Sequence, residues 1–400
     1  MLFFAISVAL VGLLYGYAGW RLIGPARLPL PLALLAWGLL AFLAALPHAY
    51  LFILRPAGLP AWLRDALGWL TYLGLGFVTL AFSLVLLRDL GWLAWSGLER
   101  LVTFLRPAAD ASSPGLGALA SPDRREALLR GSGLAVLALS GGLAGLGLWQ
   151  ARRRPRAEQV LVPIAGLPPE LEGYRIAQVT DLHVGPTIKR AFVEAVVEAV
   201  NRFDADAVVF TGDLADGTVA ELAGDVAPLA GLRARDGRYF VTGNHEYYGE
   251  LEPWLQEVRR LGFDLLLNEH RVLGRGRARL VLAGVTDLSG GDLRPDHASD
   301  PAAALAGAPA GAPRVLLAHQ PRSALAAARA GCDLVLSGHT HGGQFAPWKY
   351  LIPLQQPYVS GLHRVDASTW IYVSRGAGYW GPPVRLLAAS EVTCLTLTRA

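Results

Sequence analysis

Asp, Asn and His residues follow several short apolar segments in the second half of this 400-residue sequence. Ligand sites in α/β proteins gather at the carboxyl ends of strands, so these polar residues should meet if the segments belong to one sheet system. They comprise five of the chain's nine histidines, two aspartates and one asparagine, namely Asp181, His183, Asp213, Asn244, His245, His319, His339 and His341. Burying so many polar groups without partners costs free energy, and a bound metal is the economical compensation.

The types of these side chains indicate which metal they would hold. Imidazole and carboxylate ligands without thiolate favour Zn, Mn, Fe or Ni over Ca. The candidate ligands are too many for one tetrahedral ion and suit two divalent ions that share a bridge. Two ions about 3.5–4 Å apart hold the attacking and leaving oxygens of a displacement at phosphorus and make hydroxide available near neutral pH. The pattern therefore predicts a two-metal hydrolase, without choosing among phosphomonoester, phosphodiester and pyrophosphate substrates.

The segments that carry these residues read as an α/β domain, because short apolar runs alternate with helical patterns. Five main strands are expected at 175–180, 205–211, 238–242, 315–318 and 333–336. Helices are expected at 188–203, 220–232 and 251–261, and further strands at 264–267, 280–283, 370–373 and 392–398. Gly212, Gly243 and Gly338 stand beside the polar clusters, where they permit tight turns and close backbone approach.

The first 150 residues differ from residues 151–400 in being mostly long apolar stretches. About 20 apolar residues cross the hydrocarbon layer of a bilayer. Four stretches are long enough, at 1–20, 30–54, 67–87 and 131–149. We therefore predict an N-terminal all-α transmembrane bundle of about four helices and a C-terminal α/β domain. No charge lies deep inside these stretches, which favours a membrane anchor over a transporter. The more specific alternative is that the helices help to deliver a lipid substrate.

The predicted spans make the chain a multi-pass protein of the cell membrane, but its basic residues are nearly balanced between the two sides. The pair Arg124 and Arg125, before the last span, resembles a twin-arginine export signal and favours an extracytoplasmic hydrolase domain. The arginines that follow that span, at 152, 153, 154 and 156, argue for the cytoplasmic face. Both orientations stay open.

Charge and cysteine usage narrow the function further. The net charge is +4, and no basic face with interleaved aromatics stands out, so no nucleic acid is expected as a partner. Cys332 and Cys394 lie far apart and form no metal-binding or redox spacing. Two buried free thiols are favoured over a single disulfide. Nothing in the sequence favours one oligomeric state.

The polar clusters also carry a family resemblance. Asp181-x-His183, Gly212-Asp213, Gly-Asn-His-Glu at 243–246, His319, and Gly-His-Thr-His-Gly-Gly-Gln at 338–344 occur in the order of the calcineurin-like metallophosphoesterase superfamily. The sequence is most similar to its membrane-associated bacterial branch, which resembles YaeI and YkuE, over about residues 160–398. The resemblance implies a four-layer αββα metallophosphoesterase sandwich.

The resemblance further implies a role for each matched residue. Asp181, His183 and His341 would hold one ion. Asn244, His319 and His339 would hold a second, and Asp213 would bridge the two. Asn244 and His245 would bind substrate, and His245 would either stabilise phosphoryl charge or protonate the leaving oxygen. Arg375 is a further candidate for binding substrate, with a solvated structural role as the equal alternative. Glu246 and Asp287 are candidates for orienting the ligand histidines, and the alternative for both is an ordinary surface carboxylate.

These expectations converge on a metal-dependent phosphoric ester hydrolase that uses metal-activated hydroxide, with a lipid-linked substrate at the membrane as a further expectation. Some relatives cleave the pyrophosphate of UDP-diacylglucosamine, which would suit a cytoplasmic domain only. The alternative is a non-catalytic metal-binding membrane scaffold or sensor, a class that usually lacks some of the ligands or the substrate-facing histidine.

Overall fold

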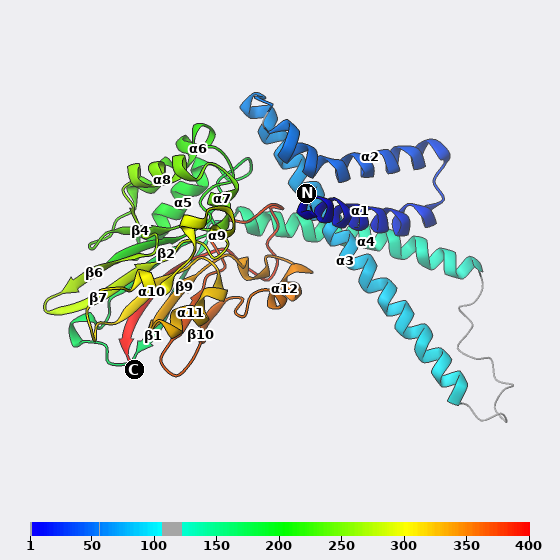
Figure 1. The fold of residues 1–400 in the computed structure, drawn as a ribbon. Helices are drawn as coiled ribbons and strands as arrows, with labels where there is room; N and C mark the ends of the chain where they lie inside the picture. Colours follow the sequence, from blue (N-terminus) through cyan, green and yellow to red (C-terminus); the bar gives the residue numbers. More distant parts are fainter. Residues whose placement is uncertain (1, 56, 106–121) are drawn as a thin grey trace. The chain divides into compact units, whose positions relative to one another are not determined.

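The protein is described by a computed structural model that covers residues 2–55, 57–105 and 122–400 (Figure 1). The chain divides into two compact units, Met1–Gly147 and Leu148–Ala400. Met1, where the first predicted span begins, and Ser121, where the predicted export signal begins, lie outside the described residues.

The first unit consists of apolar helices. These are α1 (Leu2–Leu22), α2 (Leu30–Ala49), which continues as a π-helical turn over Tyr50–Leu54, α3 (Ala61–Leu105) and α4 (Pro122–Arg152), whose last residues belong to the second unit. Within the described residues, four helical segments are long and apolar enough to cross a membrane, namely Ala5–Ala26, Leu30–Leu54, Ala61–Leu105 and Glu126–Arg152. Large apolar side chains stay exposed on all of them, as expected of helices whose solvent is lipid.

Helix α3 is longer than the span predicted at 67–87, because the helix does not end where the apolar run ends. Its 45 residues correspond to about 68 Å, roughly twice the thickness of the hydrocarbon layer. Just past the apolar run, Asp89 accepts hydrogen bonds from Tyr17 Oη at 2.6 Å and from Arg21 Nε at 2.6 Å. These contacts supply the Asp89 carboxylate with hydrogen-bond donors, and they connect α1 to α3.

The second unit contains two six-stranded sheets. The first has the order β1 (Arg156–Ile164), β12 (Glu391–Arg399), β2 (Arg175–Val179), β3 (Ala207–Thr211), β4 (Arg238–Val241) and β5 (Asp264–Leu265). The second has the order β10 (Gly361–Arg364), β11 (Trp370–Val373), β9 (Leu334–Ser337), β8 (Arg314–Leu317), β7 (Ala278–Gly284) and β6 (Glu269–Arg275). The helices are α5 (Arg190–Asn201), α6 (Val219–Val226), α7 (Asn244–Tyr248), α8 (Leu251–Arg260), α9 (Gly290–Leu293), α10 (Pro301–Ala304), α11 (Ala324–Arg329) and α12 (Trp348–Leu351).

Three buried apolar clusters separate these elements into four layers. One joins α5, α6 and α8 to the first sheet, a second fills the space between the sheets, and a third joins α10 and α11 to the second sheet. The strands supply two faces because successive side chains point opposite ways. In β2, for example, Ala177 packs toward the helices and Ile176 toward the other sheet. This arrangement confirms the predicted αββα sandwich.

The direction of the strands decides where the polar loops meet. Strands β2 to β5 run parallel, as do β7, β8, β9 and β11. We call the side on which β2, β3, β4, β8 and β9 end the carboxyl edge. Strand β12 runs antiparallel to β2 and parallel to β1, so both β12 and β1 begin at the carboxyl edge. Cys332 and Cys394 are buried and free, as predicted.

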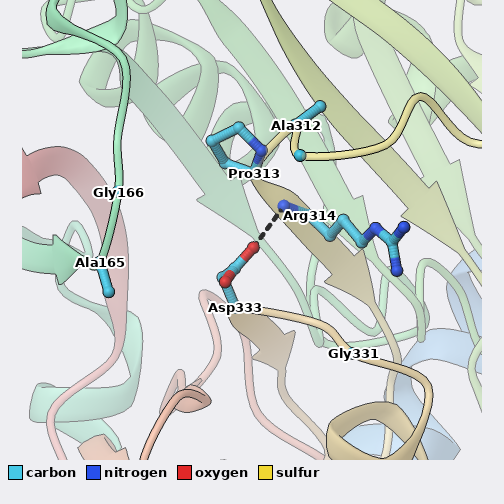
Figure 2. Close-up of a pocket in the computed structure, with 8 residues that line it drawn as sticks. Ala165, Gly166, Ala312, Pro313, Arg314, Gly331 and Asp333 are labelled. Carbon is cyan, nitrogen blue, oxygen red and sulfur yellow. Dashed lines mark hydrogen bonds between the residues drawn. The ribbon is translucent and has the colours of Figure 1, made fainter.

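The opposite edge carries a shallow pocket of about 230 Å³ (Figure 2). Its lining is mostly small residues and backbone, and its main polar contact is the 2.7 Å hydrogen bond that the Arg314 amide donates to Asp333 Oδ2. Strands β8 and β9 begin here, far along the sheet from the ends that carry the histidines. Its lining contains no histidine, whereas the five histidines predicted to act in the site follow strands that end at the carboxyl edge.

Candidate metal centre

Short loops at the carboxyl edge hold the candidate ligands in an unusual backbone conformation. Asp181, His183, Asp213, His339 and His341 all have positive φ, between 49° and 70°. They make up half of the ten non-glycine residues with positive φ in the described chain. Non-glycine residues rarely adopt this conformation, and where they do they cluster at functional sites. The loops bend sharply after each strand, which turns the side chains back over the sheet ends.

Among the described residues, three trios of side chains have ligand atoms close enough together to hold a cation; two consist of predicted ligands only, and the third joins His183 and Asp213 to His245. In the first, Asp181, His183 and His341 lie together, with 3.1 Å between the Nε2 atoms of the two histidines. His341 Nε2 is also 3.4 Å from Asp181 Oδ1. All three side chains are buried.

The second trio is Asp213, His319 and His339. His319 Nε2 lies 3.2 Å from Asp213 Oδ2 and 3.3 Å from His339 Nδ1. Asn244 joins this group through Oδ1, which is 3.2 Å from His319 Nε2. The seven ligands predicted from sequence are therefore brought together.

Asp213 lies between the two trios. The same Oδ2 atom is 3.2 Å from His319 Nε2 and 3.6 Å from His183 Nε2. Its other oxygen, Oδ1, accepts a 2.9 Å hydrogen bond from the His245 amide. Gly243 permits this approach, since a Cβ there would stand 2.2 Å from Asp213 Oδ1.

The hydrogen bond of the His319 ring leaves a ring lone pair that faces other acceptors. His319 Nδ1 lies 2.7 Å from the carbonyl oxygen of Thr211, so it carries the proton. Nε2 of a neutral ring then directs its lone pair at the oxygens of Asp213 and Asn244, which are acceptors as well. Burial acts to lower the pKa of His319, but the Asp213 charge outweighs it and raises that pKa well above its usual range. Without a metal, a proton occupies Nε2 of His319. A divalent cation would replace that proton, so this set of ligand atoms fits a divalent cation.

His245 stands beside the trios and is partly exposed. Its Nδ1 lies 2.6 Å from Asp216 Oδ1, and its ring centroid is 4.6 Å from that of His183. Burial acts to lower the pKa of His245, but the charges of Asp213 and Asp216 and the hydrogen bond to Asp216 raise it to about 9. Asp216 is held charged in turn. Burial opposes its ionisation, but His245 and His183 hold the pKa of Asp216 well below its usual range.

The two carboxylates expected to orient ligand histidines form other hydrogen bonds. Glu246 is buried and accepts from the amides of Asp213, Leu214 and Gly243 at 3.0, 2.8 and 2.6 Å, so it fixes the loop backbone. Asp287 accepts from Ser289 and Gln320. The expectation was therefore wrong about what these carboxylates bind. Asp216 and the Thr211 carbonyl orient the rings of His183 and His319.

Arg375, predicted to bind substrate, has carboxylate partners of its own. Its guanidinium binds Glu391 and, at 2.8 Å, Glu158, and its aliphatic part lies against Gly342. These contacts tie β12 and β1 to the turn that carries His341. They favour a structural role for Arg375.

Two residues of this centre were not found from sequence. Asp216 stands three residues after Asp213, and this closeness to a predicted ligand is the sequence feature that could have identified it. Arg385 lies far along the chain and is fully buried, where it donates to the carbonyl of His341 at 3.1 Å and faces His341 Nδ1 at 3.0 Å. No local pattern distinguishes Arg385 from the chain's many surface arginines.

Comparison with known proteins agrees with this geometry. The family model described as calcineurin-like phosphoesterase matches residues 174–343. A "Transmembrane protein with metallophosphoesterase domain" from Danio rerio is 36% identical over 297 residues, covering 71% of this chain and 68% of that protein. The protein of the same name from Bos taurus is 35% identical over 340 residues, covering 82% and 73%.

Both alignments cover more of the chain than the second unit contains, so they include part of the helical unit. The "Uncharacterized metallophosphoesterase YkuE" of Bacillus subtilis is 30% identical over 239 residues, covering 58% of this chain and 81% of that protein. The ordered ligand motifs, the sandwich and these relatives lead to one assignment: the chain belongs to the calcineurin-like phosphoesterase family.

Proposed function

We propose that this protein is a membrane-anchored hydrolase of phosphoester or pyrophosphate bonds that works with two divalent ions. The observation that carries the proposal is the position of Asp213 Oδ2, 3.6 Å from His183 in one trio and 3.2 Å from His319 in the other. One carboxylate oxygen shared by two sets of ligands is suited to a bridge between two ions. Residues 1–150 would form the membrane region and residues 151–400 the catalytic domain.

In this proposal one ion would be held by Asp181, His183 and His341. The other would be held by Asn244, His319 and His339, and Asp213 would contribute to both sites. When bound, the ions would polarise the phosphoryl group and lower the pKa of the attacking water. The chain's own groups do the rest. Asp216 keeps the Nδ1–H of His245 pointed at its carboxylate, which leaves Nε2 of His245 to donate a proton to the leaving oxygen.

The proposed substrate is an amphiphilic phosphate compound at the bilayer surface, because the catalytic domain follows directly after an apolar helix. We also propose that the domain lies on the extracytoplasmic side, on the strength of the arginine pair at 124 and 125. Fusions of alkaline phosphatase and of a fluorescent protein to the C-terminus test this orientation. Phosphatase activity of the fusion supports it, and fluorescence alone would place the domain in the cytoplasm.

Turnover by the full chain in detergent tests the activity. Protein stripped of metal by chelation is supplied with Mn, Zn, Ni or Fe(II) and offered bis-p-nitrophenyl phosphate and p-nitrophenyl phosphate. We expect turnover that returns with metal and is absent from Asp213→Asn. If ions bind and no ester is hydrolysed under any of these conditions, the non-catalytic scaffold or sensor becomes the better explanation.

A further inference from the structure

The last apolar helix joins the catalytic unit at the carboxyl edge. Helix α4 ends at Arg152, and β1 begins at Arg156, which pairs with Glu391 at the start of β12. Both strands begin where β2 ends, so the connection enters on the side of the metal centre. The end of α4 is fixed there, since Ala151 is buried in the core and Arg152 Nη1 donates to the Thr187 carbonyl at 3.0 Å.

Large apolar side chains stand exposed around the same edge. We define the rim as Tyr248, Trp348, Leu354, Trp380 and Leu387, all of them exposed. The extremes are Leu354 and Leu387, whose exposed fractions are 82% and 84%. Soluble proteins seldom expose contiguous apolar surface without a binding partner for it.

The rim is attached to the metal centre through short contacts. The ring centroid of His245 lies 5.2 Å from that of Tyr248 and 6.0 Å from that of Trp380. Gln344, three residues after His341, accepts from the Trp380 amide at 3.0 Å and donates to its carbonyl at 3.1 Å. Helix α12 packs directly on the turn His341–Gly343, because a Cβ on Gly343 would stand 2.3 Å from Lys349 Cα. These contacts place Tyr248, Trp380 and helix α12 beside the loops that carry His245 and His341.

Two further features are unlike an ordinary water-exposed surface. Leu387 has a φ of 61°, a backbone conformation that asparagine or glycine adopts more easily. The backbone conformation therefore does not explain why a leucine stands at this position. Near the helix exit, the Arg153 guanidinium lies over the Trp149 ring at 4.4 Å. Tryptophan with a neighbouring basic residue is typical of the membrane interface, where the ring sits among headgroups and the charge reaches phosphate. Lys349, one of the chain's two lysines, lies beside Trp348.

We propose that the rim docks into the headgroup layer of the bilayer that α4 crosses, so that the metal centre opens onto the membrane and acts on lipid phosphates. The inference rests on the proposed function in treating this edge as catalytic. A bilayer is the occupant favoured over a separate protein because a candidate membrane span enters the unit at the edge where the rim lies.

Depth-dependent quenching tests the docking in the full chain. Leu354→Cys and Leu387→Cys are labelled with an environment-sensitive fluorophore and reconstituted in vesicles of phosphatidylcholine and phosphatidylglycerol. Leu161→Cys is the matched control, because Leu161 is also exposed but pairs through Thr396 with Arg175, at the opposite edge. The unmodified chain is the labelling blank, since both of its cysteines are buried.

We expect nitroxide lipids to remove most of the emission from positions 354 and 387 and to leave position 161 unaffected. Labels at 354 and 387 that lipid nitroxides do not quench would overturn the proposal. If those labels were also blue-shifted, protein would cover the rim, either the apolar helices or a second copy. Turnover of bis-p-nitrophenyl phosphate by the same samples separates the two proposals. Turnover without quenching would contradict the docking of the rim into the bilayer. Quenching without turnover, whichever metal is supplied, would contradict the proposed function.

Discussion

Asp216 Oδ1 lies 2.6 Å from His245 Nδ1 and 3.3 Å from His183 Nδ1, so one carboxylate oxygen contacts both a predicted substrate-facing histidine and a predicted metal ligand. Each contact fixes which ring nitrogen carries the proton, and it leaves Nε2 of both rings available. The orientation of the proposed general acid and that of the ligand are thus set by the same side chain.

Asp216→Asn should lower kcat by about 10–100-fold, in the range seen when residues that orient metal ligands are removed. The amide keeps the shape but not the charge, and it can present its NH₂ group to His245. Measuring kcat together with bound metal distinguishes the two contacts. Loss of kcat with full metal content assigns the effect to His245, and unchanged kcat contradicts the role given to Asp216.

His245 should be protonated at neutral pH in the metal-free protein, because Asp213 and Asp216 raise its pKa to about 9. A raised pKa stabilises the folded state most below the unfolded pKa of about 6.5, and this contribution is lost as pH rises through about 9. The metal-free protein should therefore lose on the order of 1–3 kcal/mol of stability between neutral and strongly basic pH. NMR titration of the histidine rings gives the pKa directly, and Asp216→Asn should lower it.

Thermal unfolding of the unmodified protein and of His245→Gln, each measured across pH, tests the same pH dependence of stability in a second way. The variant should lack the part of the pH dependence that comes from this ring. An equal loss of stability at high pH in both proteins would mean that another group is responsible.

Asp213→Asn should reduce turnover by at least about 100-fold, because the amide cannot act as an anionic bridge between two ions. Metal content, measured by mass spectrometry, should fall from two ions to fewer. Asp333→Asn is the matched control, a carboxylate at the opposite edge whose partner is the Arg314 amide. Equal turnover in Asp213→Asn and the unmodified chain would remove the bridging role.

Glu246→Gln should destabilise the loops that carry the ligands. Three backbone amides donate to this carboxylate, and an amide side chain offers one acceptor oxygen and turns a donor toward the rest. A buried donor without a partner costs about 1–3 kcal/mol. A lower Tm with weakened metal binding is the expected result, and an unchanged Tm would show that water or a shifted loop replaces the carboxylate.

The ligands could be predicted from sequence because each one follows a short, strongly apolar strand within a few residues. The layers followed from the same alternation of strands and helices. Strand β1 was not predicted, since it is largely exposed on one face and lies at the border of the sheet. The full length of α3 was missed because Arg88 and Asp89 interrupt the apolar run, whereas the helix continues through them to Leu105.

Contacts that depend on the folded arrangement were the least predictable. Asp216 resembles any polar loop residue until the chain brings it against two histidines, and Arg385 acquires its partners from turns more than thirty residues away and from its own loop. Glu246 was found as a residue of interest, but its three amide partners depend on how two loops approach each other.

The pairing of β1 with β12 has a consequence for biosynthesis. Strand β12, the last in this sequence, lies between β1 and β2, so the first sheet cannot close until residues 391–399 have left the ribosome. Until then β1, a few residues after the helix proposed as the last membrane span, exposes an unpaired edge that can pair with other chains. A nascent chain that stalls before Glu391 would therefore be tethered to the membrane with an open sheet, and such chains are expected to be substrates for membrane-bound quality-control proteases.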